Sequence, residues 1–159
     1  NWPKNRLEFL IAGGPSALIG AIENAEDNAE AGVAAVKAKK IGVNDVVIGL
    51  AASGQTPYTV GVVTTAQAAG AITIGIANNP DTALLQAASY PILIATGGEI
   101  IAGSTRLKAG TSQKICLNLI SNIIMTKMGF VTNGMMSSMV PTNDKLRRRR
   151  EQIDGALRK

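Results

Sequence analysis

The sequence contains no histidine, and this absence narrows the chemistry that the protein can use. It excludes His-based catalytic triads, histidine metal ligands and a histidine general base. Acid–base catalysis near neutral pH must then use carboxylates, lysine, tyrosine or the single cysteine. That cysteine, Cys116, excludes an internal disulfide and is compatible with a reducing compartment. Because it lies in a long apolar helical stretch, we interpret it as a core residue rather than a reactive thiol.

Aromatic residues and long apolar runs are also scarce. Aromatics make up 3% of the 159 residues and all hydrophobic residues 46%, so the core must be built from Val, Ile, Leu, Ala and Met. No apolar run reaches the roughly 18 to 20 residues of a membrane span. The first residues carry no secretory signal. We therefore expect a globular chain of one main domain, in the cytoplasm and without a membrane partner.

The positive charge is unevenly distributed along the chain. The net charge is +5, and basic residues concentrate in the last fifteen positions, in 145–150 (KLRRRR) and at Arg158 and Lys159. Such a tail can bind nucleic acid or form a solvated helix face. No aromatic residues that could stack on bases alternate with these cations. The solvated face is therefore favoured, and no nucleic-acid partner is expected.

The stretch 45–57 (DVVIGLAASGQTP) is central to the fold prediction. Residues 46–50 are aliphatic without alternation, which is typical of a parallel strand covered on both faces. The following loop has two hydroxyls and a glycine, and Pro57 suits the first turn of a helix. A phosphate can bind at such a helix N-terminus. The same residue types also occur simply as turn residues and helix caps.

Further apolar runs predict a sheet whose strands alternate with helices. Strands are expected at 7–14, 71–77 and 90–95, and helical patterns at 16–22, 23–37, 57–69, 84–88 and 114–128. This order predicts βαβ units in an α/β fold, a three-layer, doubly wound, mainly parallel sheet. Ligands of such sheets bind beyond the carboxyl ends of the strands, where the loop 52–56 is placed. Residues 142–144 (TND) predict the cap of a C-terminal helical extension.

Two other stretches are rich in polar groups. Residues 23–30 (ENAEDNAE) read locally as solvated charges at a helix start, because the helix dipole favours acidic residues there. Residues 96–114 (TGGEIIAGSTRLKAGTSQK) combine glycines, hydroxyls and cations before the long apolar helix that ends at Gly129. Residues 130–140 are rich in Met and Ser and show no clear period.

Taken together, these stretches resemble the N-acetylmuramic acid 6-phosphate etherases, which are sugar isomerase (SIS) domain proteins of flavodoxin-like fold. The related glucokinase regulatory proteins share the pattern. The resemblance covers nearly the whole chain. Its motifs occur in the family's order at 11–14 (IAGG), 23–27 (ENAED), 49–58 (GLAASGQTPY), 79–80 (NP), 98–114 (GEIIAGSTRLKAGTSQK) and 142–146 (TNDKL).

The resemblance implies a reaction and a set of site residues. The family's enzymes cleave the lactyl ether of N-acetylmuramic acid 6-phosphate by elimination and hydration, giving N-acetylglucosamine 6-phosphate and D-lactate in cell-wall recycling, without metal or organic cofactor. It implies a homodimer, with a phosphosugar-binding SIS domain at 1–130 and a linker and helical region at 131–159. Glu26 would be the catalytic base, and the substrate-binding residues would be Ser53, Gly54, Gln55, Thr56, Glu99, Ser104, Thr105 and Lys108.

The chain departs from the family pattern in two places. The first SIS strand with its Gly-Ala-Gly-Thr-Ser-Gly loop, and the Ala-Ser-Glu-Cys-Pro-Pro segment with the other catalytic glutamate, should precede residue 1. Together with the missing initiator methionine, this predicts a piece of a longer protein. Gln55 stands where these etherases usually carry Arg, which removes a cation beside an anionic substrate. A non-catalytic phosphosugar-sensing regulator and another phosphosugar isomerase remain as alternatives.

Overall fold

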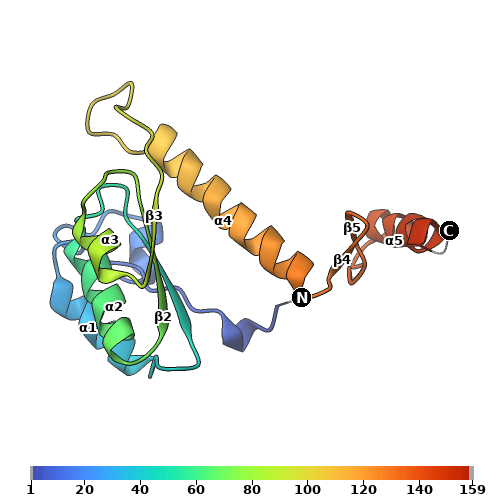
Figure 1. The fold of residues 1–159 in the computed structure, drawn as a ribbon, viewed down its shortest axis with the longest axis horizontal. Helices are drawn as coiled ribbons and strands as arrows, with labels where there is room; N and C mark the ends of the chain where they lie inside the picture. The colour runs from blue at the N-terminus through green and yellow to red at the C-terminus, as the bar shows by residue number, and fades with distance from the viewer. Residues whose placement is uncertain (1, 158–159) are drawn as a thin grey trace. The chain divides into compact units, whose positions relative to one another are not determined.

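The computed structural model describes residues 2–157, so the basic residues Arg158 and Lys159 of the predicted tail lie outside the described part. The chain forms two compact units (Figure 1). One comprises Phe9–Lys114, and the other comprises Asn1–Glu8 together with Ile115–Lys159. Within residues 2–157, no helix is both long enough and apolar enough to cross a membrane.

The unit Phe9–Lys114 is built on a parallel sheet of three strands, which pair in the order β1-β2-β3. Val46 pairs with Ile72, and Ile74 pairs with Tyr90. Helices connect consecutive strands, which confirms the predicted α/β class with a parallel sheet. The elements are β1 (Val46–Leu50), α2 (Pro57–Ala68), β2 (Ile72–Ala77), α3 (Ala83–Ala87) and β3 (Tyr90–Leu93).

Helices α2 and α3 cover one face of this sheet, and two glycines let them approach closely (Figure 1). A Cβ atom on Gly49 would lie 2.5 Å from Cγ2 of Val63, and one on Gly75 would lie 2.8 Å from the carbonyl oxygen of Leu84. Val63 and Leu84 are fully buried. On the opposite face, the paired residues Val46 and Ile72 remain exposed, as does Tyr90. The described helices thus bury one face of the sheet more completely than the other.

Helix α1 (Ala29–Ala38) packs against α2 so closely that their main chains meet. A Cβ atom on Gly32 would lie 2.4 Å from the carbonyl oxygen of Tyr58. In the reverse direction, a Cβ atom on Gly61 would lie 2.7 Å from the carbonyl oxygen of Ala29. Each helix therefore contributes one glycine to the contact, and each glycine faces the backbone of the other helix.

The strand predicted at 7–14 does not form. Residues 7–11 have no regular secondary structure, and a short 3-10 helix, η2 (Pro15–Leu18), follows. Leu10 and Ala12 pack against the α1–α2 core, whereas Phe9 is exposed. Part of the apolar run is therefore used for packing without forming a strand. A strand also needs a neighbour for its ladder of hydrogen bonds, and among residues 2–157 none pairs with this segment.

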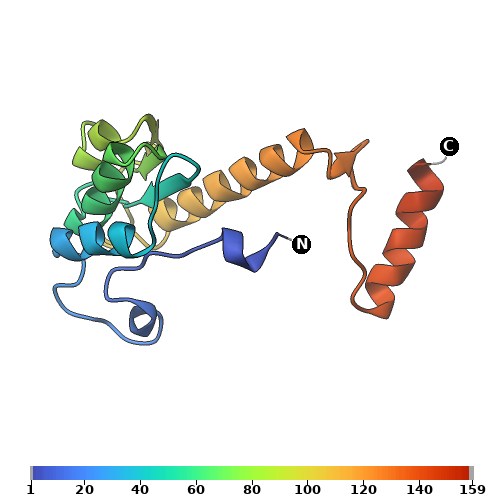
Figure 2. The same ribbon diagram turned by 90° about the horizontal axis from the view of Figure 1, so that it is seen from below.

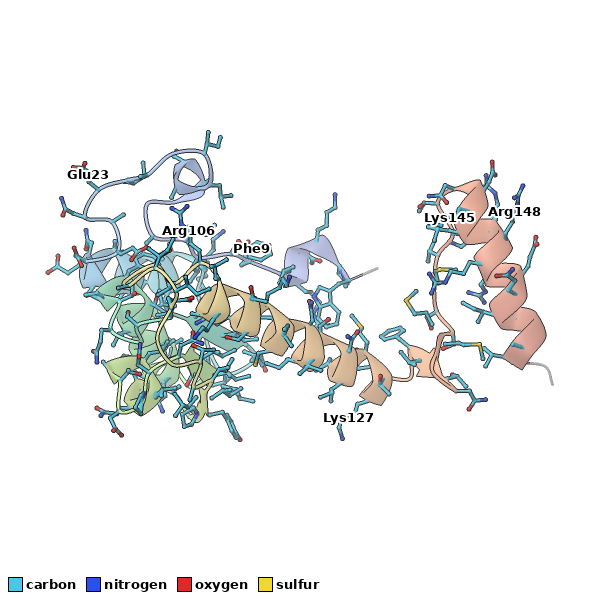
Figure 3. All side chains as sticks on the ribbon, turned by 90° about the horizontal axis from the view of Figure 1, so that it is seen from above. Phe9, Glu23, Arg106, Lys127, Lys145 and Arg148 are labelled. Atoms are coloured by element: carbon cyan, nitrogen blue, oxygen red, sulfur yellow. The ribbon has the colours of Figure 1, made fainter. Side chains whose placement is uncertain are left out.

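The helix predicted from residue 23 begins later, at Ala29. Asn24 has a φ of 58°, which a right-handed helix does not accommodate. Asn28 then caps α1, because its side-chain oxygen accepts the N–H of Ala31 at 2.9 Å. Most of the acidic residues of 23–30 consequently lie in turns before the helix, and Figure 3 shows Glu23 on this outer connection.

Helix α4 (Lys108–Lys127) begins in the first unit and continues into the second, where a hairpin and a final helix follow (Figure 2). The hairpin pairs β4 (Val131–Thr132) with β5 (Met135–Met136). It turns at Asn133 and Gly134, which both have positive φ, as a type I′ turn requires. Helix α5 (Asp144–Leu157) is capped by the predicted residue Asn143, whose side chain accepts the N–H of Leu146 at 2.9 Å.

Candidate functional site

The loops that follow the three parallel strands meet at one edge of the sheet and enclose a cavity of about 230 Å³. The loop after each strand contributes residues to the lining, and the start of α4 contributes the remaining ones. Ligands of parallel α/β sheets bind at this edge. The lining residues are Ala52 after β1, Asn78 and Asn79 after β2, residues 96–99 after β3, and Gly103, Thr105 and Ala109.

The buried amide of Asn78 holds the walls of this cavity together. Its Nδ2 donates to the carbonyl of Ile94 and to Oγ of Ser112, both at 3.0 Å. Its Oδ1 accepts from Nε2 of Gln113 at 2.9 Å. These bonds connect the ends of β2 and β3 to the first turns of α4. The sequence interpretation missed Asn78, although a polar residue directly after a buried strand and before Asn79-Pro80 is a signal for such a role.

The loop after β1 is fixed by a close contact with the segment after β2. Gly54 has a φ of 70°, and a Cβ atom there would lie 2.3 Å from Oγ1 of Thr82. The N–H of Leu84 donates to the carbonyl of Gly54 at 3.0 Å. Thr82 is only 2% exposed, and among the described residues its hydroxyl has no hydrogen-bond partner. Only glycine fits at position 54, because both the backbone angle and the space exclude a side chain.

Two hydroxyl groups frame the start of α2 in the same loop. Oγ of the exposed Ser53 accepts the N–H of Gln55 at 3.2 Å, which stabilises the turn. Thr56 occupies the N-cap position of α2, but its side chain makes no capping hydrogen bond. Pro57 at the first helical position has no N–H to donate. Hydroxyls beside a helix start can donate to an anion, as the sequence interpretation expects.

Glu99 lies at the other end of the cavity and caps α4. Its two carboxylate oxygens accept the N–H groups of Ala109 at 3.0 Å and of Lys108 at 3.1 Å. These two backbone hydrogen bonds, with a further contribution from the Lys108 charge, lower the pKa of Glu99 below its ordinary value of 4.5. The Lys108 ammonium also donates to the carbonyl of Gly98. Glu99 is therefore ionised at neutral pH and faces the positive end of the α4 dipole.

The capping by Glu99 predicts a pH-dependent helix start. Because the folded pKa is lowered, the stabilisation is present above the unfolded pKa and is lost as the pH falls through the folded pKa. As the pH falls below the ordinary Glu value of 4.5 and through the lowered pKa of Glu99, the protection factors of the Lys108 and Ala109 amides should therefore decrease. Hydrogen exchange measured by NMR across this range tests this, with Glu99→Gln as control. An equal pH response in that variant would contradict the assignment.

Glu26 is placed by its backbone at the start of α2, near the Ser53–Thr56 loop. Its carbonyl oxygen accepts the N–H of Tyr58 at 2.9 Å, so the acidic turn is tied to the helix that the loop begins. The Glu26 side chain is exposed and does not line the cavity. Among residues 2–157, no group of three His, Cys, Asp or Glu side chains could hold a metal ion.

The sequence-predicted site residues thus fall into three neighbouring groups of one unit. Glu99 and Thr105 line the cavity, and Lys108 contacts Glu99. Ser104 lies between them in the loop, where its N–H donates to the carbonyl of Ile101 at 3.0 Å. Residues 53–56 form the loop directly after the cavity residue Ala52, and Glu26 is tied to the helix that follows this loop.

A parallel sheet with helical connections and a polar cavity at its carboxyl edge defines the class of this domain as α/β, which is consistent with a SIS-like fold. In agreement, residues 1–67 match the family described as glucokinase regulatory protein N-terminal SIS domain.

Curated relatives indicate a particular family within this class, because those similar to this chain are named N-acetylmuramic acid 6-phosphate etherase. The chain is 48% identical over 153 residues to the one from Deinococcus radiodurans. It is 46% identical over 149 residues to the one from Halalkalibacterium halodurans and 46% identical over 144 residues to the one from Streptomyces coelicolor. These alignments cover 91–96% of this chain but 46–50% of the relatives. The resemblance to the etherase family is confirmed, and the chain spans about half the length of the curated relatives it matches.

Proposed function

We propose that the full-length protein cleaves the lactyl ether of N-acetylmuramic acid 6-phosphate, giving N-acetylglucosamine 6-phosphate and D-lactate. The observation that carries the proposal is the polar cavity at the carboxyl edge of the parallel sheet, in a chain similar along nearly its whole length to proteins named for this activity. The present chain supplies the phosphosugar-binding domain, proposed to span 1–130, and the start of a helical region at 131–159. The protein acts in the cytoplasm as a homodimer.

In this proposal the phosphate of the substrate binds at the Ser53–Thr56 loop. The hydroxyls of Ser53 and Thr56 donate to it, Gly54 brings the backbone close, and Gln55 contributes an amide in place of a cation. The dipole at the start of α2 adds to the attraction. The sugar then extends toward the cavity, where Thr105 and Ser104 contribute hydroxyls and Lys108 contributes positive charge. The ionised Glu99 accepts hydrogen bonds from sugar hydroxyls.

Glu26 is proposed as the base that removes the C2 proton of the sugar during elimination. A carboxylate is suited to this role in a chain without histidine, because it can accept the C2 proton as the C3–O bond to lactate breaks and return a proton to C2 when the hydroxyl of water adds at C3. The tie between the Glu26 carbonyl and Tyr58 holds the residue at the start of α2, on the side of the phosphate loop. A second carboxylate, proposed to lie in another part of the full-length protein, assists the departure of lactate.

The proposal is tested by incubating the full-length protein with N-acetylmuramic acid 6-phosphate and measuring D-lactate. Release of lactate in step with N-acetylglucosamine 6-phosphate supports it. Folded protein that binds the sugar phosphate without releasing lactate would instead support a phosphosugar-sensing regulator. That second candidate is favoured by one observation, the match of residues 1–67 to the SIS domain of glucokinase regulatory proteins. Interconversion of aldose and ketose phosphates without lactate would indicate an isomerase.

Replacing Ser53 by alanine tests the phosphate loop by itself. A hydrogen bond from the Ser53 hydroxyl to a charged phosphate is lost, so binding of N-acetylglucosamine 6-phosphate should weaken by about 1 to 3 kcal/mol. Isothermal titration calorimetry measures this change. Ser137→Ala is the matched control, because that serine has no proposed role in binding and is not among the residues that line the cavity, so the affinity should be unchanged. Equal affinities of the Ser53 variant and the unmodified protein would remove Ser53 from the site.

A further inference from the structure

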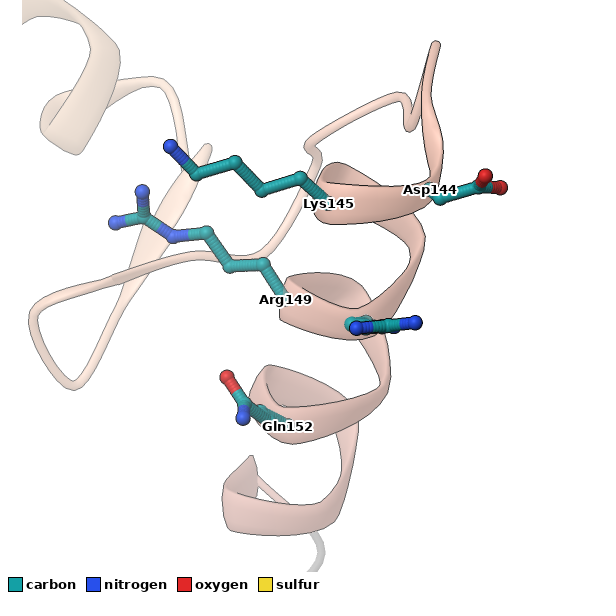
Figure 4. A pocket seen from close by; sticks show the side chains of 5 residues that line it. Asp144, Lys145, Arg149 and Gln152 are labelled. Carbon is teal, nitrogen blue, oxygen red and sulfur yellow. The ribbon is translucent and has the colours of Figure 1, made fainter.

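Helix α5 presents three cations that lack an acidic partner among the described residues. Arg147 pairs with Asp144, and Arg150 pairs with Asp154 at 2.9 Å. Lys145, Arg148 and Arg149, here called the cationic face, remain unpaired and exposed. With Gln152 and Asp144 they border an open hollow of about 460 Å³. Figure 4 shows Lys145, Arg149 and Gln152 leaving the helix on one side and Asp144 on the other.

A surface of opposite charge lies in the other unit of the same chain. The acidic segment, residues 23–30, carries Glu23, Glu26, Asp27 and Glu30, all exposed, and no basic residue occurs between Arg6 and Lys37. None of these carboxylates pairs with a cation among the described residues. The two units also differ in their total numbers of basic and acidic residues. Residues 9–114 carry six basic and seven acidic residues, whereas 1–8 and 115–159 together carry ten basic and four acidic ones.

We propose that the cationic face of one copy binds the acidic segment of a second copy. In a two-fold symmetric dimer this contact occurs twice, because each copy offers both surfaces. Charge complementarity favours this occupant over nucleic acid, since no aromatic side chain of α5 can stack on bases and three cations make a short track for a phosphate backbone. Glu26 belongs to the acidic segment, so the partner brings positive charge close to the proposed base. The inference rests on the proposed dimer, and its test measures dimer affinity and not the etherase reaction.

Charge reversal in the full-length protein tests the contact. One variant carries Lys145→Glu and Arg149→Glu, and the other carries Glu23→Lys and Asp27→Lys. The first variant gives the face a net charge of −1 against the −4 of the acidic segment, and the second variant leaves the segment with no net charge. Charge complementarity is lost in both copies of the contact, so the dimer dissociation constant should rise about tenfold or more. In a mixture of the two variants, each heterodimer has one unmodified contact and one contact in which the reversed residues of both surfaces face each other. Sedimentation velocity should therefore show dimer restored by mixing, and the dimer of the unmodified protein should weaken as salt is added.

Several results would overturn the proposal. If the unmodified protein is monomeric at the highest concentrations measured, there is no second copy to bind. If it is dimeric and both variants dimerise as tightly, the dimer uses another surface. If each variant dimerises more weakly but mixing the two variants does not restore the dimer, the two surfaces do not contact each other between copies. If Lys145→Glu with Arg149→Glu abolishes retention on immobilised heparin and leaves the dimer unchanged, the cationic face binds an anionic polymer instead. D-lactate release is measured on the same protein samples, so that a failure of the proposed contact can be distinguished from a failure of the proposed reaction.

Discussion

Replacing Glu26 by glutamine should lower the rate of D-lactate release by the full-length protein about 10²- to 10⁴-fold. Glutamine keeps the size and polarity of the side chain but cannot accept the C2 proton. Because the phosphate loop and the cavity are left intact, affinity for N-acetylglucosamine 6-phosphate should stay close to that of the unmodified protein. Steady-state assays of lactate, combined with calorimetric titration of the product, separate the loss of turnover from any loss of binding.

The acidic segment contains a matched control for this experiment. Glu30→Gln removes another exposed carboxylate, four residues further along the chain, which has no proposed role in the reaction. Its turnover should remain near that of the unmodified protein. Comparable activities of the Glu26 and Glu30 variants would show that Glu26 is not the base.

The second large effect is expected for Gly54→Ala. The added Cβ atom would overlap the side chain of Thr82, and the φ of 70° is strained for alanine. The loop must shift, so the free energy of unfolding should fall by about 1 to 3 kcal/mol. Affinity for N-acetylglucosamine 6-phosphate should fall by about tenfold to hundredfold, because the phosphate loses aligned donors. Chemical denaturation and calorimetric titration measure the two effects.

Two further variants identify the cause of this expected loss. Gly20→Ala is the control, because no atom lies within 4 Å of the added group and φ is not in the left-handed region. Thr82→Ala in the Gly54→Ala background removes two of the overlapping atoms, Oγ1 and Cγ2, and keeps Cβ, so the double variant should recover part of the lost stability. If Gly54→Ala binds and unfolds like the Gly20 variant, the close contact between the loop and Thr82 is not required.

The sheet of this protein was predictable because its signal is local. The runs around Val47, Ile74 and Ile92 are aliphatic and continuous, and each precedes a turn or a helix start, so the strands and the α2 and α3 connections follow from the sequence. The strand expected at 7–14 shows the limit of such patterns. Its apolar residues pack on the core, but a strand depends on a neighbour that the pattern of the segment itself does not reveal.

Turn chemistry explains the other differences. The acidic stretch has a helical period, but Asn28 competes with the helix as its cap, and Asn24 adopts a left-handed conformation. The hairpin after α4 has no strand-like pattern, and only Asn133-Gly134 indicates its turn. Both outcomes depend on asparagine. Its short polar side chain can bond to the nearby backbone, and its own backbone adopts positive φ more readily than that of most residues.

The candidate site was predictable in its residue types more than in its arrangement. The resemblance supplied Glu99 and Lys108, but sequence alone does not show that the Glu99 carboxylate accepts two amides of α4. Asn78 was missed because its role exists only when β2, β3 and α4 come together. Long-range contacts of this kind produce no periodic pattern in the sequence.

The contact between α1 and α2 also has an evolutionary consequence. At Gly54, the steric obstacle to a larger residue is the side chain of Thr82, so a second substitution can remove this obstacle and leave only the strain of the φ of 70°. At Gly32 and Gly61 the obstacles are the main-chain carbonyls of Tyr58 and Ala29, which every amino acid carries. No compensating mutation at the facing position can remove them. These two glycines are therefore fixed for as long as the helices keep their spacing, whatever the genetic background.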